Sequence, residues 1–146
     1  MMKTIYFDMD GTIADLYGVS NWLEYLISEN PLPYEIAKPL IRLNTLARLL
    51  NKLQREGYRI GIISWLAKAS TTEYDKKVTV AKETWLKTHL KSVQFDEINI
   101  VPHGTPKETF CKTEWDVLFD DEELNRTNWT GQAFDVDNIL EILKGM

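Results

Sequence analysis

The sequence predicts an α/β fold, in which helices cover both faces of a mostly parallel sheet. Short apolar runs typical of buried strands alternate with segments whose apolar residues recur at helical spacing. Polar residues follow several of these runs, as expected where ligands bind at the carboxyl edge of a parallel sheet. The length of 146 residues, with 44% hydrophobic and 27% charged residues, is that of one ordinary globular domain, 1–146.

The first half of the chain contains two expected strands and two expected helices. The run 3–8 contains Ile5-Tyr6-Phe7 and is followed by a turn at Gly11. Apolar residues at near-helical spacing predict a helix over 20–28, ended by Asn30-Pro31-Leu32-Pro33. Leucines predict a longer helix over about 36–56, with Pro39 in its first turn and Gly57 as its C-terminal cap. The run 58–64 then predicts a second buried strand.

The second half repeats the alternation with shorter elements. Residues 67–75 are polar and are expected to be irregular, and 80–90 is expected to be helical. The runs 98–101 and 117–119 predict two short strands, and 132–136 predicts a last one. Asp137 suits the N-cap of a closing helix that reaches about Leu143. The stretch at about 17–47 is longer than a simple crossover needs, so we expect its first part to form a small helical cap over the strand ends.

Charge and cysteine content narrow the functional classes. Lys and Arg number 17 and Asp and Glu number 22, so the net charge is −5, which argues against a general nucleic-acid binder. Cys111 is the only cysteine, so no internal disulfide can form. The first residues lead straight into a strand pattern without a signal-peptide core, and no apolar run reaches membrane-spanning length. We therefore expect a cytoplasmic protein.

Two pairs of aspartates follow two of the predicted strands. Asp8 and Asp10 come after the first strand, and Asp120 and Asp121 come after the strand at 117–119. Parallel strands would bring all four carboxylates to one edge of the sheet, where they would repel each other without a cation. A hard divalent ion with oxygen ligands, most simply Mg²⁺, resolves this repulsion. The four residues are therefore the expected metal site.

A carboxylate can also act as a nucleophile and form an aspartyl-phosphate. Such a hydrolysis needs an attacking carboxylate, a second acid/base group and a cation near the phosphoryl oxygens. Asp8 and Asp10 lie two residues apart around a turn, so one could attack while the other transfers protons. The pair predicts a phosphoryl-transfer site.

The residues Phe7-Asp8-Met9-Asp10-Gly11-Thr12 resemble the first motif of the haloacid dehalogenase-like (HAD) phosphohydrolases. Ser64, at the end of the second strand, resembles the second motif, and Leu118-Phe119-Asp120-Asp121 resembles the acidic fourth motif. DMDGTIAD, AKETWLKTHL and LFDDE look most like the 5′(3′)-deoxyribonucleotidases and related phage or bacterial proteins. The resemblance implies a Rossmann-like three-layer sandwich with a small helical cap.

The resemblance also implies roles for individual residues. Asp8 would be the nucleophile, and Asp10 would be the acid/base group while its carbonyl contacts Mg²⁺. Ser64 would bind phosphate through its hydroxyl, aided by backbone N–H groups near Trp65, and Thr12 belongs to the same phosphate-binding set. Asp120 would bind Mg²⁺ directly, and Asp121 would act through water or orient the site. An aspartate at position 10 fits the phosphatase branch better than the ATPase branch.

Two lysines compete for the third motif, the lysine that balances the charge of the nucleophile. Lys82 lies in AKETWLKTHL, where the nucleotidase-like pattern places it. Lys107 follows the third core strand and could also reach the phosphate. We favour Lys82 by local pattern and keep Lys107 as a phosphate or substrate contact.

The expected reaction is Mg²⁺-dependent hydrolysis of a small phosphorylated metabolite, with a nucleoside 5′-monophosphate as the favoured substrate. Tyr17, Trp22 and Trp65 are candidates to wall a base or sugar pocket. The sequence around His103 shows no residue pattern typical of a metal site or a catalytic triad. A phosphorylatable module resembling a response-regulator receiver is an alternative. In such a module the adjacent acidic pair follows the first strand, whereas in this sequence the adjacent pair, Asp120 and Asp121, comes late. The residues are also compatible with a non-catalytic metal-binding protein of the same fold and with a polynucleotide end-phosphatase.

Overall fold

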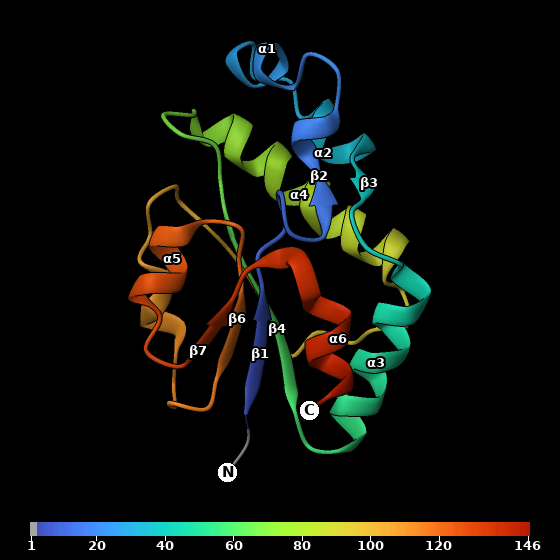
Figure 1. Cartoon of the computed structure of the whole chain (residues 1–146). Helices are drawn as coiled ribbons and strands as arrows, with labels where there is room; N and C mark the ends of the chain where they lie inside the picture. The colour runs from blue at the N-terminus through green and yellow to red at the C-terminus, as the bar shows by residue number, and fades with distance from the viewer. Residues whose placement is uncertain (1–2) are drawn as a thin grey trace.

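The computed structural model describes residues 3–146, so Met1 and Met2, which bear on the expected absence of a leader, lie outside the described residues. Its main sheet has five parallel strands in the order β5-β4-β1-β6-β7 (Figure 1). The strands are β1 (Thr4–Phe7), β4 (Arg59–Trp65), β5 (Glu97–Val101), β6 (Val117–Phe119) and β7 (Gln132–Phe134). The predicted α/β class with a parallel sheet is confirmed, and β1 lies at its centre.

Both faces of the sheet are covered. Successive strand residues point to opposite sides, so each strand contributes to two separate cores. One face carries Ile5, Phe7 and Ile62, which belong to a core shared with α3 (Leu43–Arg55), α6 (Ile139–Lys144) and the second half of α4 (Thr72–His89). The other face carries Tyr6 and Leu118, which pack with Trp129 after α5 (Glu123–Asn128). The helix on this second face, α5, was not predicted from the sequence.

The helix expected over about 36–56 begins later than predicted. The short helix α2 (Leu32–Ile36) ends before Pro39, and Lys38–Pro39 forms strand β3 instead. Proline has no backbone N–H and restricts the residue before it to extended conformations, so the chain leaves the helix here. The remaining helix, α3, begins only at Leu43, and Gly57 follows its end with a positive φ of 99°. The prediction of one continuous helix was therefore wrong at its first turns.

The helix expected over 80–90 begins eight residues earlier, at Thr72. Thr71 is its N-cap, and its side chain accepts a hydrogen bond from the Tyr74 backbone N–H. This side chain satisfies one of the free donors of the first turn. Residues 72–75 are therefore helical, although their polarity predicted irregular structure.

The segment 16–37 stands above the carboxyl ends of the strands (Figure 1). It lies between β2 (Ala14–Asp15) and β3, which pair as a small antiparallel sheet, and it contains the short 3-10 helix η1 (Leu16–Gly18), α1 (Trp22–Ile27) and α2. The cap insertion was expected at about 17–47. These bounds cover nearly all of the segment 16–37, but they also include β3 and the first turn of α3, which lie outside it. None of the helices in the described residues has the length and apolar character needed to cross a membrane.

Candidate active site

The carboxyl ends of β1, β4 and β6 meet beneath the segment 16–37. Asp8 directly follows β1, Ser64 is the second-last residue of β4, and Asp120 directly follows β6. All three residues are buried. The parallel register of the central strands thus brings together residues that are up to 112 positions apart in the sequence, as expected from their positions after apolar runs.

Asp8 is fixed by three contacts. Its backbone N–H donates to the Phe119 carbonyl at 2.9 Å, which ties it to β6. Its Oδ2 accepts from the Thr12 hydroxyl at 3.0 Å, and its Oδ1 lies 3.0 Å from Lys107 Nζ. Thr12, which the sequence assigned to the phosphate, therefore holds the Asp8 carboxylate. Gly11 permits the return turn between them, because its φ of +81° is a conformation that glycine adopts without strain.

Asp8, Asp120 and Asp121 form an acidic cluster whose ligand oxygens lie within 4.8 Å of one another. Burial and then the charge of Asp8 raise the pKa of Asp120 to about 6. Burial, the hydrogen bond to Asp8 and the neighbouring charges raise the pKa of Asp121 to about 8. Such mutual repulsion is what a divalent cation would relieve, and carboxylate oxygens are the ligands that Mg²⁺ prefers. Three of the four predicted metal carboxylates are thus suited to a hard cation.

The carboxylate of Asp10 does not join this cluster. Its Oδ2 lies 3.0 Å from Lys82 Nζ instead. Burial raises the pKa of Asp10 above its ordinary value, although Lys82 opposes this shift. Asp8 and Asp10 therefore occupy different electrostatic surroundings, which is the condition for two neighbouring carboxyl groups to take different chemical roles.

Lys107, not Lys82, lies against Asp8. Its ammonium is 3.0 Å from Asp8 Oδ1 and 2.7 Å from Asp120 Oδ2, and only 1% of the residue is exposed. Burial lowers the pKa of Lys107, but the two carboxylates outweigh it, so the pKa lies above the ordinary value. The connection from β5 to β6 crosses β4 and β1 in the strand order, which carries Lys107 over the centre of the site. The expectation that Lys82 contacts Asp8 is corrected by this geometry.

Lys82 forms a second cluster on the other side of the turn. From the middle of α4, its Nζ reaches Ser64 Oγ and the Trp65 carbonyl at 2.7 Å each, besides Asp10. An ammonium group only donates hydrogen bonds, so Ser64 Oγ must act as the acceptor. The hydroxyl proton of Ser64 is then free to be donated to another acceptor. Lys82 thus prepares Ser64 as a donor within the site.

A cavity of about 270 Å³ opens above Asp8 and Asp10. Its walls are mostly aromatic and aliphatic, and they include the three aromatic residues predicted from sequence: Tyr17, Trp22 and Trp65. Tyr17 packs edge-on against Trp22, with ring centroids 5.0 Å apart. Asn125 and Glu122 line it as polar groups, and the Asn125 side chain also donates to Asp120 at 3.2 Å.

Two further wall residues were missed by the sequence reasoning. Tyr34 of α2 enters the cavity and its ring lies 5.2 Å from Lys82 Nζ. His103 packs against Trp65 with ring centroids 4.9 Å apart. His103 lies four residues before Lys107 in the same connection, and this proximity was the only signal in the sequence that could have placed it at the site.

The comparisons with known proteins concern the fold. No protein-family model matches the chain, and no curated protein matches it either. It is similar to D,D-heptose 1,7-bisphosphate phosphatase from Burkholderia thailandensis, with 10% identity and a TM-score of 0.56 over 98% of this chain and 97% of that one. It is also similar to the enzyme of that name from B. bronchiseptica, solved with magnesium and phosphate, with 11% identity and a TM-score of 0.54 over 99% of each chain. The chain therefore has the α/β fold of these phosphatases, a five-stranded parallel sheet between layers of helices.

Proposed function

We propose that the protein is a Mg²⁺-dependent phosphomonoesterase of the HAD type that works through an aspartyl-phosphate on Asp8. The observation that carries this proposal is the position of Asp8, held by Thr12 and Lys107 within the acidic cluster. The likeness in fold to a phosphatase solved with magnesium and phosphate supports the reaction class. A Mg²⁺ ion bound by Asp8, Asp120 and Asp121 would neutralise the phosphoryl oxygens.

In the first step, a carboxylate oxygen of Asp8 forms a bond to phosphorus and the bond from phosphorus to the ester oxygen breaks. Lys107 offsets the negative charge that gathers there, because its ammonium already touches Asp8. Ser64 donates its free hydroxyl proton to a phosphoryl oxygen, since Lys82 occupies its acceptor side.

Asp10 supplies the proton that the leaving oxygen needs. Its raised pKa favours the protonated form of the group before that transfer. In the second step the Asp10 carboxylate takes a proton from water, the water oxygen bonds to phosphorus and the bond to Asp8 breaks. Inorganic phosphate leaves, and both aspartates return to their starting states.

A nucleoside 5′-monophosphate is the substrate class that the cavity walls favour. Tyr17, Trp22 and Trp65 provide aromatic surface on the side where the leaving group would lie. Aromatic side chains stack on the flat face of any base, whereas a sugar rich in hydroxyl groups needs many polar partners. The small cavity volume of about 270 Å³ and the net charge of −5 both weigh against a polynucleotide end as substrate.

A phosphate-release screen tests the proposal. Purified protein is assayed against nucleoside monophosphates, sugar phosphates and an oligonucleotide carrying a 5′-phosphate, with Mg²⁺ and with EDTA. We expect release from nucleoside monophosphates with Mg²⁺ only, and none from Asp8→Asn. Release that survives thorough chelation would contradict the metal assignment, and a preference for sugar phosphates would contradict the substrate class. Absence of release from every compound would favour a non-catalytic phosphate- or metal-binding protein of the same fold.

A further inference from the structure

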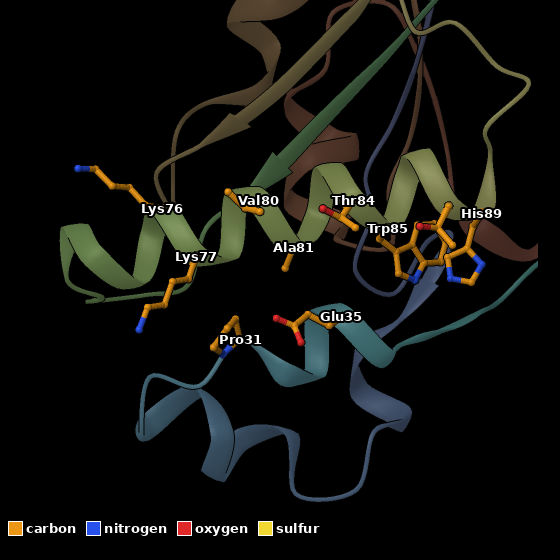
Figure 2. Close-up of a pocket in the computed structure, with 10 residues that line it drawn as sticks. Pro31, Glu35, Lys76, Lys77, Val80, Ala81, Thr84, Trp85 and His89 are labelled. Carbon is orange, nitrogen blue, oxygen red and sulfur yellow. The ribbon is translucent and has the colours of Figure 1, made fainter.

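A groove outside the candidate active site runs between α2 and α4 (Figure 2). It has a volume of about 640 Å³ and is lined by Val80, Ala81 and Thr84 of α4, by Glu35 of α2 and by Pro31, the N-cap of α2. Val80 stands at the rim of this groove and is 62% exposed, which is unusual for a valine in the middle of an 18-residue helix. This surface has no role in the proposed reaction.

The outer face of α4 carries a stripe of residues at alternating spacings of three and four. The stripe consists of Glu73, Lys76, Val80, Glu83 and Lys87. Glu83 is partly exposed and the other four are exposed, and within residues 3–146 none of the four charged members forms an ion pair. A 3–4 repeat aligns residues along one side of a helix and is the spacing with which two helices pack lengthwise. The stripe is therefore an exposed, mostly charged side of α4 with one apolar residue at its centre.

The charges of this stripe are opposite in sign on the two sides of Val80. Glu73 lies seven residues before Val80 and Lys87 lies seven after it. Lys76 lies four residues before and Glu83 three residues after, on the same flank of the helix. If a second α4 ran antiparallel about a two-fold axis at Val80, each acidic residue would face a basic residue of the other helix. A parallel arrangement in register would instead bring like charges together.

The groove offers a third complementary pair. Lys77 borders it from α4, three residues before Val80, and Glu35 projects toward it from α2 beneath Ala81 and Thr84 (Figure 2). In the same antiparallel arrangement, Lys77 of a second copy would lie at the level of residue 83 and on the groove side. It would then reach Glu35, which is exposed. In this arrangement, charged residues of both the stripe and the groove would therefore meet residues of opposite charge on a second chain.

We propose that a second copy of this chain docks on this face, antiparallel along α4, with the two Val80 side chains in contact at the two-fold axis. Such an isologous interface places each charge pair twice. Exposed ion pairs are individually weak, so the dimer forms at high micromolar rather than nanomolar concentration and weakens as salt rises.

Charge reversal tests the proposal with sedimentation equilibrium on the full chain, at concentrations up to about 0.5 mM because exposed pairs are weak. Lys76→Glu and Glu83→Lys each replace two attractive pairs per dimer with repulsive ones, so each variant alone associates about tenfold to a hundredfold more weakly than wild type. An equimolar mixture of the two variants restores association as a heterodimer. The double variant Lys76→Glu/Glu83→Lys restores the homodimer.

Lys144→Glu and Glu141→Lys on α6 are the matched controls, because they change net charge equally on exposed side chains elsewhere. These controls should dimerise like wild type, and thermal unfolding checks that every variant is folded. A wild-type protein that stays monomeric throughout the concentration range overturns the proposal. So does a dimer that Lys76→Glu and Glu83→Lys leave unchanged, or a mixture that fails to associate.

Discussion

Two buried lysines divide the candidate active site into two regions. Lys107 lies between the carboxylates of Asp8 and Asp120, in the region suited to a divalent cation. Lys82 lies on the other side of the turn and contacts only one carboxylate, that of Asp10, together with the neutral oxygens of Ser64 and Trp65. Both lysines are 1% exposed, so burial alone does not distinguish them.

The two lysines differ in the groups that their ammonium groups contact. Lys107 offsets charge on the proposed nucleophile and competes with a cation for the same oxygens. Lys82 orients the proposed acid/base group and the proposed phosphate donor, and it lies away from the acidic cluster. Two equally buried lysines of one site can therefore have different roles: Lys107 compensates negative charge, and Lys82 orients its neighbours through hydrogen bonds.

The largest expected effect separates the two lysines by substitution. Lys107→Met should lower kcat/KM by about 10³-fold, because it removes the charge beside the attacking oxygen, whereas Lys82→Met should lower it by about 10- to 100-fold. Steady-state kinetics with a range of Mg²⁺ concentrations measures both. Lys107→Met should also reach half-saturation at lower Mg²⁺, because a competing cation is gone, and Lys82→Met should not. A greater loss in Lys82→Met would reverse the assignment.

A second prediction concerns the acidic cluster without metal. Asp121, with a pKa of about 8, holds a proton in the folded protein that the unfolded chain releases above about pH 4. The stability linked to this proton is therefore fully present below about pH 4 and is lost as pH rises through about 8. In EDTA, Asp121→Asn should gain Tm relative to wild type as pH rises from about 5 to about 8. A constant difference in Tm over that range would refute the raised pKa.

With Mg²⁺ present, the wild type rather than Asp121→Asn should have the higher Tm at the alkaline end of this pH range. A cation that binds only the folded protein stabilises it, and the wild type offers one more carboxylate than Asp121→Asn. The wild type should therefore gain more Tm from Mg²⁺ than the variant does, with the largest gain near pH 8. Equal gains in the two proteins would exclude Asp121 from the metal site.

The smallest expected effect concerns the wall that supports Lys107. The Trp65 ring lies 5.4 Å from Lys107 Nζ, and its Nε1–H donates to the Thr105 carbonyl at 2.8 Å. Trp65→Phe keeps an aromatic ring but loses this hydrogen bond, which is worth about 1 kcal/mol. We expect kcat/KM to fall only by about 3- to 10-fold, with unchanged Mg²⁺ half-saturation. Loss comparable to that of Lys107→Met would mean that the indole has a larger role than support.

The sequence predicted the parts of the molecule that depend on local pattern. The apolar runs before Asp8 and Asp120 predicted two strands of one parallel sheet, and with them the meeting of both aspartates at one edge; that the two strands are neighbours is seen only in the structure. Local pattern also placed Ser64 at the end of its strand. These relations follow from sheet topology, which brings the carboxyl ends of parallel strands together whatever lies between them.

The parts that were missed depend on contacts between distant residues. Lys107 meets Asp8 across 99 positions, because an entire connection crosses the sheet, and no neighbouring residue signals this. Pro39 fits the first turn of a helix by local pattern, although pairing of β3 with β2 favours an extended chain there. Thr71 lies in a polar stretch that resembles a loop, but its side chain begins α4 and its hydroxyl is held by Glu29, to which it donates at 2.8 Å across 42 positions. Neighbouring elements decided each of these outcomes.

The central claim is that Asp8 carries the phosphoryl group during turnover. Asp10→Asn should leave Asp8 able to attack an aryl phosphate, whose leaving group needs little protonation, while it slows water activation by about 10²–10⁴-fold. Intact-mass analysis of this variant after brief reaction with an aryl phosphate and Mg²⁺ should show one added phosphoryl group per chain. Borohydride trapping and peptide analysis should locate it on Asp8, and Asp8→Asn/Asp10→Asn should show none. Label on another residue, or full turnover by Asp8→Asn, would contradict the account.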